Sequence, residues 1–172
     1  MTTGWIIEEL TELNTEDANR LTKLLVDVVE DGASIGFLPP LDPHVARVYW
    51  SMVLGDHVRL WVARLNGDIV GSVQLHLVAK QNGRHRAEIA KLMVHPSSQR
   101  KGIGRSLMHA AEARAREEKR SLLVLDTREG DPSNGLYASL GYTEAGKIPD
   151  YAESADGKLD ASVFYFKRLS GE

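Results

Sequence analysis

The chain has 172 residues, a length that favours one domain with a single substantial hydrophobic core. Its net charge of −3 argues against a general attraction to nucleic acid or to an anionic membrane surface. The absence of cysteine excludes disulfides, thiolate metal sites and a cysteine nucleophile. No apolar run approaches the ~20 residues that span a bilayer, and the first residues begin no signal peptide, so we expect a cytoplasmic protein.

The first third of the chain predicts a strand followed by two helices. Residues 5–10 are typical of a strand. The next segment predicts a helix, because its apolar residues recur at helical spacing: Leu21, Leu24, Leu25, Val28 and Val29. Glycines and prolines within 32–40 break this helix, and a second helix is expected over 42–54, with Pro43 in its first turn.

The rest of the chain predicts a sheet with further helices. Strands are expected at residues 59–64, 69–78, 86–94 and 122–126 and in two segments after Tyr142, the last over 161–168. Helices are expected over about 106–119 and 133–140. The order is therefore β-α-α-β-β-β-α-β-α-β-β, which indicates one α/β domain over 1–172, with a mixed sheet and helices on both faces.

A glycine-turned loop, Gln-Arg-Lys-Gly-Ile-Gly-Arg at 99–105, lies between a predicted strand and a predicted helix. Gly102 and Gly104 let successive backbone N–H groups turn inward. Together with the positive end of the helix and the flanking cations, these groups make a pocket for a diphosphate. The alternative is a surface turn capped by glycines. A P-loop does not fit the spacing, and Leu107 stands where a dinucleotide fingerprint needs its third glycine.

This loop resembles the acetyl-CoA pyrophosphate loop of the GNAT acetyltransferase superfamily, and the order of elements resembles the GNAT fold over essentially the whole chain. Several blocks resemble, within that superfamily, the tabtoxin resistance family: residues 32–37, 82–83, 86–88, 91–94, 125–127, 156–159 and 165–167. The resemblance implies an N-acetyltransferase that transfers acetyl from acetyl-CoA directly to a primary amine of a small molecule. A β-lactam amino-acid toxin would be one such acceptor, and its acetylation would give resistance.

The resemblance also implies where acetyl-CoA binds. The backbone of Leu92, Met93 and Val94 would pair with the pantetheine arm, and a bulge in this strand would direct one N–H to the thioester carbonyl. The diphosphate would lie on the loop and the start of the helix: Gln99, Arg100, Lys101, Gly102, Ile103, Gly104, Arg105 and Ser106. Many GNAT chains carry asparagine seven residues before the catalytic tyrosine. This chain has Gly130 there, which leaves Asn134 as a weaker candidate for a cofactor contact.

Acetyl transfer needs a base for the amine and an acid for the departing thiolate. Glu88 and Asp126 lie on two strands that are parallel and splay apart in a GNAT sheet, and both match residues thought to act as bases in the tabtoxin resistance family. Tyr137 matches the family's acid. The alternatives are an ion pair of Glu88 with Arg86 or Lys91, a capping or turn role for Asp126, and simple helix packing for Tyr137.

The loop between the first two helices covers the acceptor side in GNAT folds. The resemblance therefore implies substrate contacts at Ser34, Gly36 and Phe37. Trp61 and Tyr151 are expected beside them, with packing in the core or at the rim as the alternative for both. The alternative is an ordinary interhelical loop. No two of the six histidines have the spacing of a metal site, so no metal cofactor is expected.

Two other functions stay open at this level. A non-catalytic acetyl-CoA sensor would need only the diphosphate loop, whereas retention of both carboxylates and the tyrosine favours an enzyme. A protein or peptide acetyltransferase would use the same chemistry on a larger acceptor. We expect no nucleic-acid or membrane partner. Dimers through the last strands are common among GNAT folds, and the sequence leaves the oligomeric state open.

Overall fold

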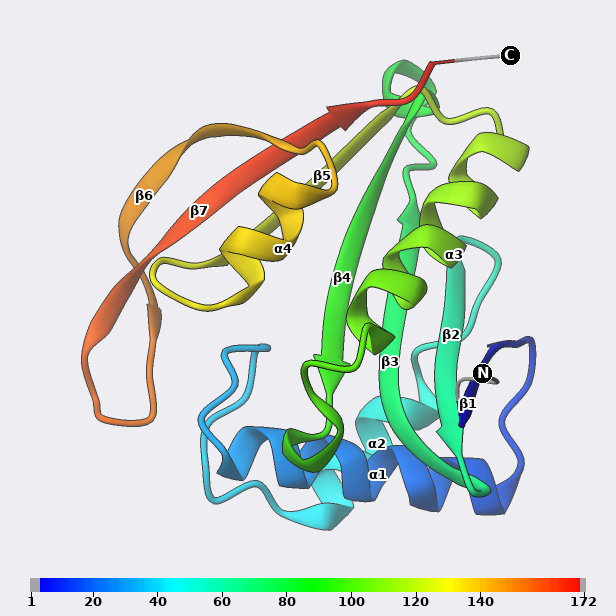
Figure 1. Cartoon of the computed structure of the whole chain (residues 1–172), viewed down its shortest axis with the longest axis vertical. Helices are drawn as coiled ribbons and strands as arrows, with labels where there is room; N and C mark the ends of the chain where they lie inside the picture. The colour runs from blue at the N-terminus through cyan, green and yellow to red at the C-terminus, as the bar shows by residue number, and fades with distance from the viewer. Residues whose placement is uncertain (1–3, 171–172) are drawn as a thin grey trace.

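A computed structural model describes residues 4–170, which form one seven-stranded sheet with helices on both faces (Figure 1). The strands are β1 (Trp5–Leu10), β2 (Val58–Leu65), β3 (Asp68–Leu77), β4 (Arg86–Val94), β5 (Leu122–Arg128), β6 (Thr143–Glu153) and β7 (Leu159–Arg168). The helices are α1 (Thr15–Glu30), α2 (Pro43–Ser51), α3 (Ile103–Glu117) and α4 (Ser133–Ser139). The predicted order of strands and helices and the mixed sheet are confirmed.

Several predicted boundaries were wrong by two or three residues, and three of them have a clear structural reason. The second helix ends at Ser51 rather than 54, because the chain turns at Met52, whose N–H bonds back to Tyr49. The third helix begins at Ile103 rather than 106, because Gly102 itself adopts the left-handed conformation that starts it. The fifth strand continues past Asp126 to Arg128, since its whole length pairs with β7.

The sheet separates two hydrophobic cores. One lies under α1 and α2 and contains all five apolar residues that predicted the first helix. The other lies under α3 and α4. Side chains alternate along β2, so that Leu60 and Val62 join the first core while Trp61 and Ala63 join the second. Both faces of the central strands are therefore covered, and the site must lie where the sheet opens.

The sheet opens between β4 and β5, which are parallel neighbours only at their beginnings. Their pairing runs from Arg86 with Leu122 to Glu88 with Val124, and no further pairs form between these two strands in the described chain. β5 then follows β7, which pairs with it up to Arg128. Figure 1 shows β5, β6 and β7 leaving the rest of the sheet together with α4. The later half of β4 therefore presents an unpaired backbone edge toward the gap.

The expected bulge in β4 is confirmed on the opposite edge of that strand. Ser72 of β3 pairs with Met93 and Gln74 pairs with Ala90, so Lys91 and Leu92 together oppose one residue. Lys91 has φ +56°, in the left-handed region that a lysine rarely occupies. The bulge thus changes the direction of β4 where it borders the gap.

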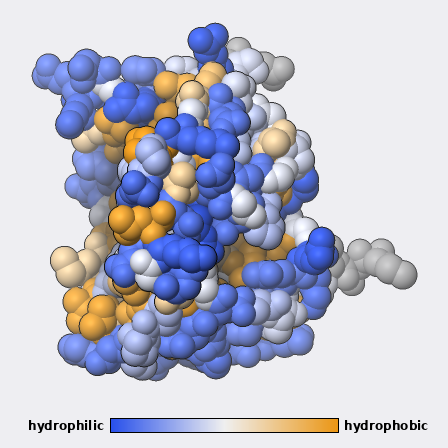
Figure 2. Space-filling view, turned by 90° about the vertical axis from the view of Figure 1, so that its left-hand side faces the viewer, coloured by the Kyte–Doolittle hydropathy of each residue, from blue (hydrophilic) through white to orange (hydrophobic). Residues whose placement is uncertain are grey.

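The outer surface is mostly hydrophilic. Figure 2 looks at the side of the molecule that carries β6, β7 and the α1–α2 loop, and apolar residues form only small, separate groups on it. No helix in residues 4–170 combines the length and the apolar character needed to cross a bilayer.

Candidate active site

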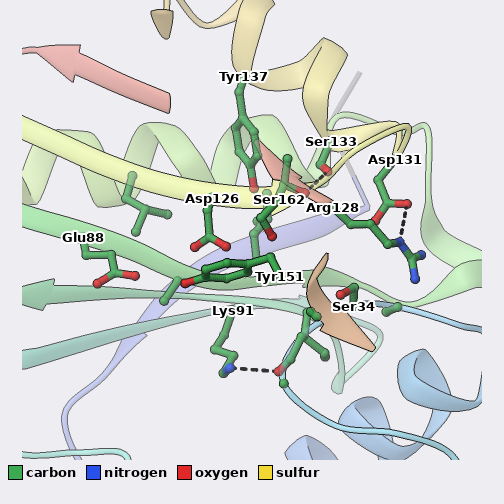
Figure 3. A pocket seen from close by; sticks show the side chains of 18 residues that line it. Ser34, Glu88, Lys91, Asp126, Arg128, Asp131, Ser133, Tyr137, Tyr151 and Ser162 are labelled. Atoms are coloured by element: carbon green, nitrogen blue, oxygen red, sulfur yellow. Dashed lines mark hydrogen bonds and ion pairs between the residues drawn. The ribbon is translucent and has the colours of Figure 1, made fainter. Parts of the chain in front are cut away.

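A pocket of about 370 Å³ lies in the gap between β4 and β5 (Figure 3). Its walls come from five segments: β4, β5 with the turn after it, the α1–α2 loop, α4 and the β6–β7 hairpin. Glu88, Asp126 and Tyr137, the three residues predicted to be catalytic, all line it. The splaying of the two strands therefore brings together side chains that are up to 49 positions apart in the sequence.

Glu88 and Asp126 place two free carboxylates on the two strands that border the pocket (Figure 3). Neither forms a hydrogen bond or an ion pair within residues 4–170, so Glu88 is not tied to Arg86 or Lys91. Burial by the pocket walls raises the pKa of Glu88, and the charge of Asp126 raises it further, against the opposing effects of Lys91 and Arg86. A carboxylate with a raised pKa is a stronger base than an ordinary glutamate.

Tyr137 directs its hydroxyl into the pocket from α4, on the side of Asp126 (Figure 3). Its ring packs against Tyr142 and Tyr165, with centroid separations of 5.9 Å in both cases. The hydroxyl makes no hydrogen bond within the described chain. Burial raises the pKa of Tyr137, with smaller contributions from Asp126 and Tyr165, so the phenol stays protonated. The packing alternative and the acid role are therefore compatible: the ring packs while the hydroxyl is free.

The diphosphate loop follows the end of β4 directly. Gly102 has φ +88°, and no side chain caps α3, so the first N–H groups of this helix remain open to an anion. A Cβ at Gly104 would make only ordinary contacts, 3.5 Å from Leu136 and 3.8 Å from Val94, so side-chain packing does not require glycine there. Arg105 is fixed by a 2.7 Å bond to the Ser139 hydroxyl, while Arg100 is exposed. This arrangement fits the diphosphate of a phosphorylated cofactor.

Asn134 has a structural role in the turn between β5 and α4. Its side-chain amide donates to the carbonyls of Arg128 and Asp131, both at 2.9 Å, and its oxygen accepts from the Tyr165 hydroxyl at 2.8 Å. It is not among the residues that line the pocket. The geometry therefore gives no free group of Asn134 to the cofactor contact that was predicted.

The predicted substrate residues divide into two pairs. Ser34 and Gly36 of the α1–α2 loop line the pocket. Phe37 instead packs edge-on against Tyr49, with ring centroids 5.2 Å apart, and does not line it. Trp61 was misplaced by the sequence prediction: the alternation along β2 turns it into the core under α3, where it is only 5% exposed.

Arg128 was missed by the sequence analysis and connects three walls of the pocket. Its guanidinium donates to Asp131 after β5, to the Ser154 hydroxyl of the hairpin and to the carbonyl of Gly32 in the α1–α2 loop, each at 3.0 Å. The sequence prediction ended the fifth strand at Asp126. Only a strand extended to residue 128 would have placed Arg128 beside the pocket. Arg128 thus fixes the segments that surround the acceptor side.

Lys91 was also missed, except as an ion-pair partner for Glu88. Its ammonium donates to the carbonyl of Ile35 at 2.8 Å and lies 6.0 Å from the ring centroid of Phe37. Burial lowers the pKa of Lys91, while the charges of Asp126 and Glu88 oppose that change. Tyr151 completes the pocket from β6 and packs edge-on against Phe164. Tyr151 was among the residues expected on the acceptor side, whereas no signal in the sequence placed the Lys91 ammonium there.

Within residues 4–170, no group of three or more histidine, aspartate or glutamate side chains is arranged to hold a metal ion.

Comparison with known proteins gives a consistent family. The model of the Acetyltransferase (GNAT) family matches residues 27–142, a segment that includes the diphosphate loop and all three predicted catalytic residues. The chain is similar to an uncharacterized N-acetyltransferase from the hisH–hisA intergenic region of Azospirillum brasilense. The two are 34% identical over 126 residues, which are 72% of this chain and 75% of that one.

Solved structures share the fold. The ribosomal-protein-alanine N-acetyltransferase of Brucella melitensis superposes with a TM-score of 0.80 at 23% identity, covering 95% of this chain and 99% of that one. The YncA structure from Salmonella typhimurium, which holds its cofactor acetyl-CoA, superposes with a TM-score of 0.78 at 21% identity. The alignment covers 99% of this chain and 96% of that one.

Replacing Asp126 with Asn should lower the pKa of Glu88 toward its usual range, because the neighbouring like charge is removed while the burial remains. Titration of the Glu88 carboxyl carbon by NMR measures this directly. Glu12→Gln, an exposed site on the β1–α1 connection, is the control and should leave the pKa of Glu88 unchanged. A Glu88 pKa that stays the same or rises in Asp126→Asn would contradict the coupling.

Replacing Arg128 with Lys should loosen the α1–α2 loop, since one ammonium cannot replace a guanidinium that bonds three segments. We expect a local loss of about 1–3 kcal/mol, seen as faster amide hydrogen exchange at residues 31–38. Arg59→Lys is the matched control, because Arg59 also makes several bonds but pairs with Glu118. Equal exchange at 31–38 in both variants would show that Arg128 does not hold the loop.

Proposed function

The chain belongs to the GNAT family and is an acetyl-CoA-dependent N-acetyltransferase, and we propose that Glu88, Asp126 and Tyr137 carry out transfer to a primary amine of a small molecule. The observation that supports this most is the set of three ionisable groups that face one pocket without any hydrogen-bond partner in residues 4–170. A sensor that only bound the cofactor would have no use for them. Unpaired polar groups on the walls of a pocket cost stability, and they suit groups that exchange protons with a ligand.

The donor has a path to this pocket along β4. The open N–H groups at the start of α3 would hold the diphosphate, and the unpaired edge of β4 between Glu88 and Val94 would accept the pantetheine arm as a further strand. Leu92 lines the pocket beside the bulge, whose backbone is the candidate oxyanion donor. Acetyl-CoA supplies the acetyl group as a thioester, and the residues of this chain supply position and proton transfer.

The two carboxylates can remove the proton that prevents the acceptor amine from reacting. At a lysine-like pKa of 10.4, about one amine in a few thousand is neutral at pH 7. Glu88, with its raised pKa, or Asp126 would first take one proton from the ammonium, and the neutral nitrogen would then attack the acetyl carbon. As the N–C bond forms and the C–S bond breaks, the Tyr137 hydroxyl gives its proton to the leaving thiolate. The nitrogen loses its second proton through water, and this proton restores the tyrosine hydroxyl. No covalent enzyme intermediate is required.

The shape of the pocket favours a small acceptor over a polypeptide. The α1–α2 loop is bonded to β5 through Arg128 and to β4 through Lys91, and Tyr151 borders the pocket from the hairpin. These contacts bound the acceptor side on several walls around a cavity of about 370 Å³. The blocks that resemble the tabtoxin resistance family support an amino-acid toxin among the acceptors, and hence a role in toxin resistance.

Release of the CoA thiol in the presence of a panel of amines tests this function. We expect amine-dependent release in the wild type, and a loss of about 10²- to 10⁴-fold in kcat in each of Glu88→Gln, Asp126→Asn and Tyr137→Phe. The Kd of acetyl-CoA, measured by calorimetry, should stay within about twofold, because these side chains lie apart from the diphosphate loop. Glu12→Gln, an exposed position, is the control for loss of an acidic side chain.

The alternatives give different results in the same experiment. Tight acetyl-CoA binding without release for any small amine would point to a protein acceptor or a sensor. Full activity in all three variants would refute the assigned proton transfers even within the established family.

A further inference from the structure

The ammonium of Lys91 is the one cation among the described pocket-lining residues that has no acidic partner. The other cation, Arg128, pairs with Asp131 at 3.0 Å. Lys91 has no carboxylate within 4.0 Å in residues 4–170, and its one hydrogen bond goes to the carbonyl of Ile35 at 2.8 Å. An ammonium group has three N–H donors, so two remain for a ligand. The charges of Glu88 and Asp126 act on this half-buried ammonium only from beyond ion-pair distance, so an anionic ligand in direct contact with it would stabilise it further.

The surroundings of this ammonium are fitted to it. Lys91 has φ +56°, a conformation that glycine or asparagine adopts more readily, and the chain places a lysine there. Gly36, with φ +91°, lies directly against the ammonium: a Cβ at that position would lie 2.9 Å from Nζ and would displace the end of the lysine side chain. The backbone therefore has a positive φ at both residues of this contact, Lys91 and Gly36. This is a built position within the pocket and not a free surface lysine.

The position of Lys91 assigns it to the acceptor rather than to the donor. Figure 3 draws Lys91 and Ser34 on the side of the pocket away from Tyr137, with Glu88 and Asp126 at intermediate positions. The group bonded by Lys91 belongs to the α1–α2 loop, which lies across the pocket from α4. An acceptor whose ammonium is drawn to the two carboxylates would therefore extend its other end toward a positive charge.

We propose that Lys91 is a specificity residue that binds a carboxylate of the acceptor, so that the enzyme selects zwitterionic amines of the amino-acid class over diamines and polyamines. This inference rests on the proposed function, because it needs a small amine as acceptor. The ammonium of the acceptor would lie near Glu88 and Asp126, and its carboxylate would bind the ammonium of Lys91. A polyamine would bring a second cation to Lys91 and would be repelled.

The test compares matched acceptors and matched variants. CoA thiol release is measured with the twenty L-amino acids, with their carboxamides, and with putrescine, cadaverine and spermidine. For the acceptors that react, the wild type should prefer the acid over its carboxamide by about 10- to 100-fold in kcat/KM, the value expected for one charged hydrogen bond. Lys91→Arg should keep this preference.

Lys91→Gln is the decisive variant, because it removes the charge while it keeps a polar N–H donor on a slightly shorter side chain. It should lower kcat/KM for the acid far more than for the carboxamide, so that the preference is lost, and it should keep the wild-type Kd for acetyl-CoA. Lys80→Gln, an exposed site, is the control for loss of a lysine. A merely structural tether would lower kcat/KM for acid and carboxamide by the same factor, and that result would overturn the proposal.

Two further results would also overturn it. Equal kcat/KM for acids and carboxamides in the wild type would show that no carboxylate is recognised, and a preference for polyamines would show that Lys91 does not repel a second cation. Absence of turnover with every amine would refute the proposed small-molecule function itself, and this inference with it. Turnover without selectivity would refute the inference alone.

Discussion

The divergence of β4 and β5 is the constraint on which the rest of the site depends. Two parallel strands that pair for only three residues leave backbone edges and side chains open in the middle of a sheet. An empty gap would lower the stability of the fold, because the backbone groups along it lack strand partners and the side chains lack packing contacts. The bulge in β4 and the continuous pairing of β5 with β7 maintain this divergence. The other segments that line the pocket are arranged around these two strands.

The fold stabilises these walls from outside the gap. Two packed cores hold the central strands rigid, while Arg128 and Lys91 join the α1–α2 loop to the strands on either side. The reactive groups are thereby left without internal partners. Partial burial and the charge of Asp126 raise the pKa of Glu88, and deep burial raises the pKa of Tyr137. The shift makes Glu88 a stronger base, as its proposed role requires, and it leaves the Tyr137 hydroxyl protonated and so able to donate.

Local sequence signals predicted much of this arrangement, and long-range contacts decided the rest. Helical spacing located α1, and the glycines at 102 and 104 located the start of α3 within three residues, because both signals are read along a few turns of chain. Trp61 was misplaced because the direction of a side chain in β2 depends on which helix covers each face. The positions of Lys91 and Arg128 depend on hydrogen bonds to the α1–α2 loop, 56 and 96 positions earlier in the chain, respectively. No local pattern encodes such contacts.

A crystal structure of the protein with CoA bound tests the central claim most directly, because it locates the sulfur relative to the gap. We predict that the pantetheine arm lies between β4 and β5, bonded to the free edge of β4, with its sulfur within hydrogen-bond reach of the Tyr137 hydroxyl. Glu88 and Asp126 should face the open side of that sulfur. A pantetheine arm that bypasses the gap, or a sulfur remote from all three side chains, would contradict this assignment of the site.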